Sequence, residues 1–253
     1  MPLCPDTYYH SLQDPIERIK LEMSACLRWS DRLGLSEGIC NHFSVEVPGQ
    51  PGAFLLNPQG LHWSEIKVSD IITVATDGTL IDGKHAPEPT AFFIHSGIHR
   101  NVASASVVLH THMPSATTLA CLDPGEVIHC TQNSLRWFNR ISYDKDYNGL
   151  ALDHSEGNRM AALMKDNRVL FLANHGVVVV GPNMAEAFDD LYYLERACEV
   201  QINAMQTGQL LSVIQEHHGE HAYRQIMKDR TQCYSHLEAI IRILLRESPE
   251  LAE

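Results

Sequence analysis

The chain has 253 residues, of which 44% are hydrophobic and 20% are charged, and its formal net charge at pH 7 is −12. This length and composition are typical of a globular protein with one large domain or two small ones, and with a sizeable core. The acidic balance argues against nucleic acid and anionic membrane surfaces as binding partners. We therefore expect neither nucleic acid nor membrane among its partners.

The seven cysteines are scattered along the chain, odd in number and without a CxxC pair. This usage is typical of reduced thiols in a cytosolic protein. The sequence shows no N-terminal signal pattern and no apolar run of about 18 residues, the length that spans a bilayer. We therefore expect a soluble, cytoplasmic protein.

The first half of the chain predicts a helix followed by an antiparallel meander. Apolar residues recur at helical spacing over 14–33, and Gly34 ends that helix. Short strands are expected within 37–49 and 53–60 and at 71–75, followed by a hairpin turn at Asp77 and Gly78.

The second half of the chain alternates helices and strands. Pro87 and Pro89 precede the next predicted helix. Helices are expected at 90–100, 113–122, 133–138, 155–164, 184–206 and, broken or irregular near its middle, 222–246. Strands are expected at 107–112, 127–131, 168–173 and 177–180, and a loop at 140–153. The pattern indicates an α/β fold in which helices cover both faces of an antiparallel or mixed sheet.

The strand at 107–112 ends in two histidines, His110 and His112, separated by one residue. Side chains at i and i+2 of a strand point to the same face, so the two imidazoles project side by side. A pair held in this way can supply two ligands of a metal site. The alternative is a pair of alternating residues on a half-exposed strand.

A third histidine, His175, follows another hydrophobic run and precedes Gly176. The glycine permits a tight turn that places the imidazole in a cleft. The alternative is a loop histidine that bonds only the backbone. We predict that His110, His112 and His175 hold one divalent metal.

Glu195 lies on the apolar stripe of the long helix at 184–206. A buried glutamate is rare unless it is paired. It can orient a metal-binding histidine from the second shell of the site. It can equally pair with Arg28 or Arg196.

Several motifs together resemble the class II aldolase/adducin family. They are HTH at 110–112, NHGVVVVG at 174–181 and LYYLERACEVQ at 191–201, with NHFSVEVPG, FLLNPQGLHWSEI, FIHSGIHR and TQNSLRWFNRISYDKDYNG in the same order. The FxxHSxIH helix and the glutamine before SLRWF are most similar to the adducin-like subgroup. The resemblance covers about 15–209. We therefore expect one domain over 1–253, with a helical C-terminal extension at 210–253.

The resemblance implies a three-layer αβα fold with a central, mainly antiparallel sheet of about nine strands. It also implies a zinc-type metal on His110, His112 and His175. Family aldolases act on small molecules through an enediolate stabilised by the metal as Lewis acid. They are commonly homotetramers, so a tetramer or dimer is expected here.

The chain departs from the sugar-phosphate aldolases at their proton-transfer position. There a glutamate four residues before the helix histidine is the acid/base, whereas this chain has Ala91 four residues before His95. Glu88 is out of register by three. The remaining candidates are Glu88, His95, a metal-bound water, and Tyr143 or Tyr147 from a neighbouring subunit. His95 has the alternative of a satisfied core histidine.

The phosphate-binding pattern of those aldolases is also weakened. Pro89-Thr90 and Asn41-His42 stand where the family has a Ser-Ser pair and a Gly-Asn turn. Asn41, His42, Ser44 and Thr90 remain candidates for substrate or anion binding.

Two functions follow from these residues. The first is a metal-dependent lyase, or a related epimerase or dehydratase, that acts on a small hydroxy-carbonyl compound. The second is a non-catalytic, adducin-like interaction domain that retains a metal site. The three histidines favour the enzyme, and the alanine at the family glutamate position favours the interaction domain.

Overall fold

The computed structural model describes residues 4–5 and 7–253. Among them, eight strands form one sheet in the order β4-β3-β2-β1-β5-β8-β7-β6. The strands are β1 (His42–Glu46), β2 (Ala53–Leu56), β3 (Ile72–Ala75), β4 (Leu80–Asp82), β5 (Val107–Thr111), β6 (Ile141–Asp144), β7 (Val169–Leu172) and β8 (Gly176–Gly181). Only β6 and β7 pair in parallel. The predicted mainly antiparallel sheet is confirmed, with one strand fewer than the roughly nine that the resemblance implied.

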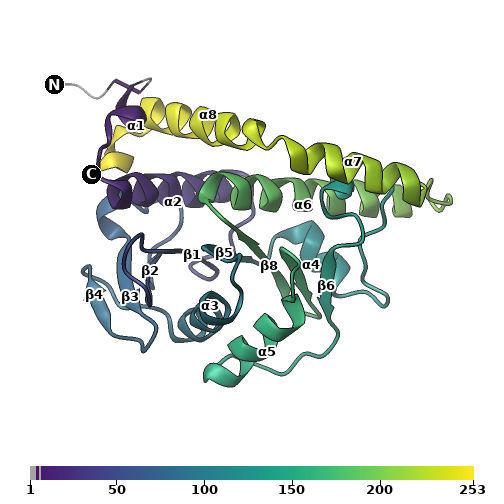
Figure 1. The fold of residues 1–253 in the computed structure, drawn as a ribbon, viewed down its shortest axis with the longest axis horizontal. Coiled ribbons are helices and arrows are strands. Elements are labelled where there is room, and N and C mark those ends of the chain that lie inside the picture. Colours follow the sequence, from purple (N-terminus) through teal and green to yellow (C-terminus); the bar gives the residue numbers. More distant parts are fainter. Residues whose placement is uncertain (1–3, 6) are drawn as a thin grey trace.

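Helices cover both faces of this sheet (Figure 1). They are α1 (Tyr8–Ser11), α2 (Pro15–Arg32), α3 (Pro89–Asn101), α4 (Pro114–Ala120), α5 (His154–Met164), α6 (Met184–Gln206), α7 (Glu216–Lys228) and α8 (Thr231–Glu247), with 3₁₀ turns η1 (Val68–Asp70), η2 (Asn133–Trp137) and η3 (Pro249–Ala252). Helices α3 and α5 lie on one face, and α2, α4 and α6 lie on the other. This is the predicted αβα arrangement. None of the helices formed by the described residues is long and apolar enough to cross a membrane.

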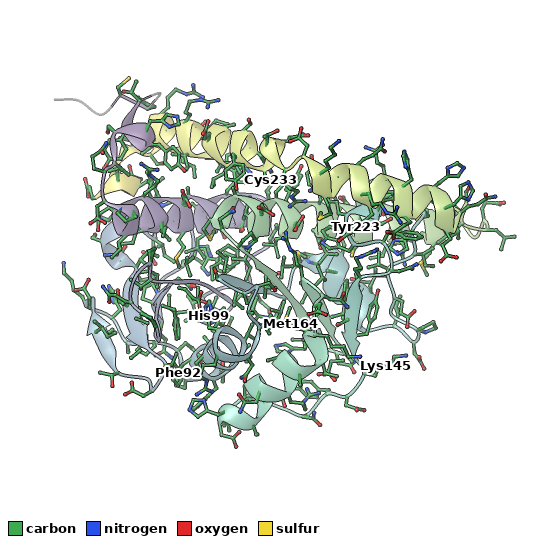
Figure 2. All side chains as sticks on the ribbon, in the orientation of Figure 1. Phe92, His99, Lys145, Met164, Tyr223 and Cys233 are labelled. Carbon is green, nitrogen blue, oxygen red and sulfur yellow. The ribbon has the colours of Figure 1, made fainter. Side chains whose placement is uncertain are left out.

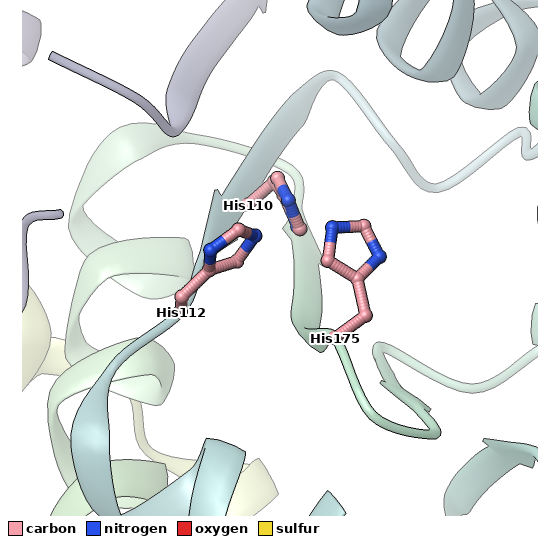
Figure 3. A group of neighbouring side chains, drawn as sticks. All are labelled: His110, His112 and His175. Atoms are coloured by element: carbon pink, nitrogen blue, oxygen red, sulfur yellow. The ribbon is translucent and has the colours of Figure 1, made fainter. Parts of the chain in front are cut away.

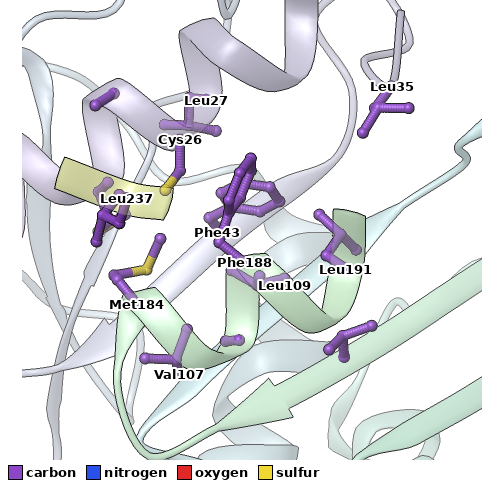
Figure 4. Packing of buried hydrophobic residues seen from close by; sticks show 14 of the residues in the cluster. Cys26, Leu27, Leu35, Phe43, Val107, Leu109, Met184, Phe188, Leu191 and Leu237 are labelled. Atoms are coloured by element: carbon purple, nitrogen blue, oxygen red, sulfur yellow. The ribbon is translucent and has the colours of Figure 1, made fainter. Parts of the chain in front are cut away.

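Alternation along the strands divides the core between the two faces. On β5, Val107 and Leu109 pack beneath α2 and α6, where Phe43 and Phe188 are fully enclosed (Figure 4). Val108 points to the opposite face and joins the cluster under α3 and α5. His110 shares the face of Val108, because side chains two apart on a strand project alike.

Helix α8 adds a further layer outside α2 and α6 (Figure 1). Its apolar face, which includes Leu237, Ile241 and Leu244, belongs to the same buried cluster as α2 and α6. Arg28 on α2 bonds the backbone oxygen of Ile66 at 2.7 Å.

Two local predictions were wrong, and a third is confirmed. Residues 127–131 are not a strand, since the Ile128 amide bonds the Gln201 side chain at 2.7 Å instead of a neighbouring strand. The predicted loop at 140–153 contains β6, which pairs with β7 despite its weak hydrophobic period. The predicted break or irregularity in the C-terminal helix is confirmed, because Asp229 and Arg230 separate α7 from α8.

A buried hydrogen-bond chain joins β1 to α3. His99 donates from Nδ1 to the Ala105 carbonyl at 2.8 Å, so its Nε2 accepts from the Ser44 hydroxyl at 2.7 Å. The Ser44 oxygen in turn accepts from His95 Nδ1 at 2.6 Å. Figure 2 shows His99 on the α3 side of the sheet. Every donor in this chain is matched to an acceptor when both imidazoles are neutral.

Acidification should therefore destabilise the fold. Burial lowers the pKa of His99 to about 4 and that of His95 well below its usual value. Above about pH 6.5 both histidines are neutral in the folded and in the unfolded protein. Below this pH the histidines of the unfolded protein take up protons first, so the free energy of unfolding falls. For His99 alone we expect a loss of roughly 2 kcal/mol by pH 4.5.

Urea denaturation of chelator-treated protein at several pH values measures this loss. His99→Phe should make the decline between pH 6.5 and 4.5 shallower, whatever its effect on stability at pH 7. An unchanged slope would contradict the account.

Candidate metal centre

Three histidine rings meet at the end of β5 and at the start of β8 (Figure 3). The ring centroids of His110, His112 and His175 lie 4.7 to 5.0 Å apart. One nitrogen from each ring lies within 4.8 Å of the others, close enough for small side-chain rotations to place all three on one ion. The cluster is the one that the sequence predicts.

The pairing of β5 with β8 brings the three rings together. His110 lies opposite Val178, and β8 begins one residue after His175. The tight turn before His175 is made by Asn174, whose φ is 56°, and not by Gly176 as expected. Gly176 is required for a different reason. A Cβ there would lie 2.5 Å from the Thr111 carbonyl oxygen and 2.8 Å from the His112 ring.

Backbone and carboxylate partners fix which ring nitrogens are free. His110 donates from Nδ1 to the Val177 carbonyl at 3.0 Å, which leaves Nε2 with its lone pair. His112 Nδ1 bonds a Glu37 carboxylate oxygen, and its Nε2 is buried without a partner. Both imidazoles are thereby held with the lone pair of Nε2 free to bind a metal ion. A buried nitrogen without a partner, such as His112 Nε2, fits a metal ligand.

Glu37 was not predicted from the sequence. It lies in the turn before β1, where no periodic pattern indicates a buried role. Its contact with His112 spans 75 residues of sequence. Only the three-dimensional pairing of β1 with β5 reveals it.

His110 and His175 are poor bases where they lie. Burial lowers the pKa of His110 well below its usual value, and the neighbouring His175 and His112 add to the effect. Burial and the nearby His112 lower the pKa of His175 to about 4. Neutral imidazole is the form that binds a metal ion.

The triad lies in the wall of a cavity of about 620 Å³. Its polar lining includes Glu37, Asn41, His42, Glu88 and Thr90. Its volume falls within the range of about 300 to 1,000 Å³ that is typical of small-molecule sites.

Asn41 and His42 lie beside the triad. Asn41 has a φ of 74° and accepts from the His112 backbone N–H at 3.1 Å, so it positions His112 as well as lining the cavity. His42 faces His110 across the β1–β5 pair. Burial lowers the pKa of His42 to about 4.

Glu88 reaches the cavity although it is three residues out of register with the family glutamate. It is the N-cap of α3, and its Oε2 accepts from the Ala91 backbone N–H at 2.7 Å and from the Thr90 hydroxyl at 2.5 Å. An N-cap side chain folds back over the first helical turn, which places the carboxylate in the cavity wall.

Ser44 and His95 do not line the cavity. Both are fully buried between β1 and α3, where their polar atoms bond one another. This corrects the predictions that Ser44 binds an anion and that His95 transfers a proton. Since β1 is covered by α3 at this point, His95 is a core histidine.

Two further predicted residues make other contacts within the chain. Glu195 accepts backbone N–H bonds from Ser115 at 2.7 Å and from Ala116 at 2.9 Å. It therefore caps α4 and does not bond a ligating histidine, which corrects the second-shell prediction. Tyr143 accepts from the Val127 backbone N–H at 3.0 Å and lines a different cavity, whereas Tyr147 lines the triad cavity.

The sequence and the fold now decide the family. Residues 21–202 match the family described as Class II Aldolase and Adducin N-terminal domain. The chain belongs to this family.

Named relatives and solved structures agree with that assignment. "Putative aldolase class 2 protein PA3430" of Pseudomonas aeruginosa is 34% identical over 190 residues, covering 75% of this chain and 72% of that protein. Rat alpha-adducin is 28% identical over 191 residues, which are 74% of this chain but 26% of the adducin. An aldolase II superfamily protein from Pseudomonas syringae superposes with a TM-score of 0.88 at 28% identity, over 96% of this chain and 98% of that one.

Removing the α4 cap should destabilise this class II aldolase/adducin protein. Glu195→Ala leaves the Ser115 and Ala116 amides without their acceptor, at a cost of about 2 kcal/mol in the free energy of unfolding. Urea denaturation measures it. Glu199→Ala, one turn further along α6 and more exposed, is the control, and it should stay within about 0.5 kcal/mol of the unmutated protein. Equal effects of the two substitutions would contradict the capping role.

Proposed function

We propose that His110, His112 and His175 bind one divalent metal, with zinc as the native ion. The supporting observation is the convergence of three imidazoles in one part of a cavity wall, with one nitrogen of each ring within 4.8 Å of the others. Imidazole nitrogens suit zinc, and three protein ligands leave a position for a water or substrate.

On this basis we propose a metal-dependent lyase-type enzyme, an aldolase or a related epimerase or dehydratase, acting on a small hydroxy-carbonyl compound. The bound metal would supply Lewis-acid chemistry to adjacent hydroxyl and carbonyl oxygens. The fold supports this class, since an L-fuculose 1-phosphate aldolase from Glaciozyma antarctica superposes with a TM-score of 0.83 at 22% identity.

Side chains and backbone groups of the protein would orient the ligating histidines and move a proton of the substrate. Glu37 and the Val177 carbonyl keep His112 and His110 in the tautomer whose Nε2 lone pair is free to bind the metal. Glu88 is our candidate for proton transfer. One of its oxygens is held by the first turn of α3, and the other is available to take a proton from substrate in the cavity. Met160 and Ile94 supply an apolar wall that excludes water.

Metal analysis and a turnover screen test the proposal together. Purified protein should contain about one zinc-class ion per chain, and His110→Ala or His175→Ala should lose it. His218→Ala, an exposed histidine on α7, is the control and should retain the ion. The metal-loaded protein should cleave or dehydrate a member of a hydroxy-aldehyde and hydroxy-ketone panel, and the two triad variants should not.

Protein without bound metal would contradict the proposal. A stable metal without any turnover, together with unchanged metal content in Glu88→Ala, would favour the adducin-like interaction domain.

We also propose that the protein is a homo-oligomer. Large apolar side chains are exposed near the cavity mouth, with Ile39, Tyr147 and Leu150 at 51%, 56% and 72% and the adjacent Leu152 at 68%. Exposed apolar groups that gather in this way are typical of interfaces.

Size-exclusion chromatography with light scattering should therefore give a mass of two or four chains. Leu152→Glu should shift the mass toward that of one chain, whereas Val213→Glu on the distant segment between α6 and α7 should not. A monomeric unmutated protein would contradict the proposal.

A further inference from the structure

The first turn of α3 faces the triad cavity, and its hydrogen-bond donors already bind a carboxylate of the chain itself. Thr90 and Ala91 line the cavity, and they supply the hydroxyl and the backbone N–H that an incoming phosphate would use at a helix N-terminus. Both donors are engaged by the Glu88 carboxylate, at 2.5 and 2.7 Å. The Glu88 side chain thus occupies the position at which a phosphate would bind to these donors.

The rest of the lining offers no charge that would favour a phosphate. Among the residues that the structure describes, no lysine or arginine lines this cavity. The basic side chains near the loop at 145–153 face elsewhere. Arg159 bonds Glu156 at 2.9 Å and Asp144 at 2.8 Å, and Lys145 lies 3.7 Å from Glu126. Glu37 adds a second carboxylate to the lining.

Part of the cavity lining is apolar. The buried side chains of Ile94, Ala151 and Met160 form this part. Burial of a hydrocarbon group against such a wall contributes roughly 25 cal/mol for each Å² removed from water.

We infer that the substrate is a hydroxy-carbonyl compound without a phosphate group and with an apolar portion, and that Glu88 excludes phosphorylated analogues by occupying their binding position. This inference rests on the proposed function, because the metal is what would hold the hydroxyl and carbonyl oxygens. It adds the class of substrate and the residue that selects it.

Hydroxamates test the inference without turnover, because their two adjacent oxygens bind zinc as a hydroxyl and a carbonyl would. Calorimetric titration of the zinc-loaded protein compares acetohydroxamate, hexanohydroxamate and phosphoglycolohydroxamate. Hexanohydroxamate should bind at least about tenfold tighter than acetohydroxamate. Phosphoglycolohydroxamate should bind at least about fivefold more weakly than acetohydroxamate.

Glu88→Ala should reverse the second preference. It frees the Thr90 and Ala91 donors, so phosphoglycolohydroxamate should gain about tenfold or more in affinity, while hexanohydroxamate changes by less than about threefold. Asp153→Ala is the matched control. It removes the same kind of N-cap from α5, outside the cavity, and should leave all three affinities unchanged. If Glu88→Ala does not fold, Glu88→Gln removes only the charge and should still give a gain of about threefold.

Tighter binding of phosphoglycolohydroxamate than of the neutral hydroxamates by the unmutated protein would overturn the inference and leave the proposed function intact. So would an unchanged phosphoglycolohydroxamate affinity in both Glu88 variants. Failure of every hydroxamate to bind protein that carries zinc would overturn the proposed function, and the inference with it.

Discussion

The antiparallel pairing of β5 with β8 is the interaction on which the rest of the site depends. It places His110 next to the strand that follows His175, and it supplies the Val177 carbonyl that fixes the His110 ring. The strands approach so closely at Gly176 that any side chain there would meet the Thr111 backbone. A shift of one residue in register would turn His110 and His112 to the opposite face of the sheet, away from His175.

The same pairing makes the imidazoles costly to charge. Burial lowers the pKa of His110 and of His175, and neighbouring rings of the triad add to the effect. The Nε2 atom of His112 is buried without a partner, and a buried polar atom without a partner loses its hydration without compensation. A bound cation would offset this cost. The carboxylate of Glu37 then balances part of the charge that such a cation brings.

Much of this arrangement could be predicted from local sequence. His110 and His112 were identifiable because a strand has a period of two, and the helix at Met184–Gln206 because its apolar residues recur at helical spacing. What escaped prediction depends on contacts between distant segments. Glu37 reaches His112 across 75 residues, and Glu195 reaches Ser115 across 80. Strand β6 has too weak a period to be recognised, since only its pairing with β7 defines it.

Glu88 shows how a motif departure can mislead. Counting along the chain places Ala91 at the family glutamate position and leaves Glu88 outside α3. In the structure, the capping geometry of α3 returns the Glu88 carboxylate to the same cavity. The register of a helix therefore does not determine which side chains reach a site at its N-terminus, because the cap lies before the first helical residue.

The central claim is that three imidazoles hold one metal ion. X-ray absorption spectroscopy at the zinc edge of the zinc-loaded protein tests it most directly. The account predicts a first shell with three imidazole nitrogens at about 2.0 to 2.1 Å, the remainder oxygen, and no sulfur. A shell that contains sulfur, or one with fewer than three imidazoles, would contradict the account.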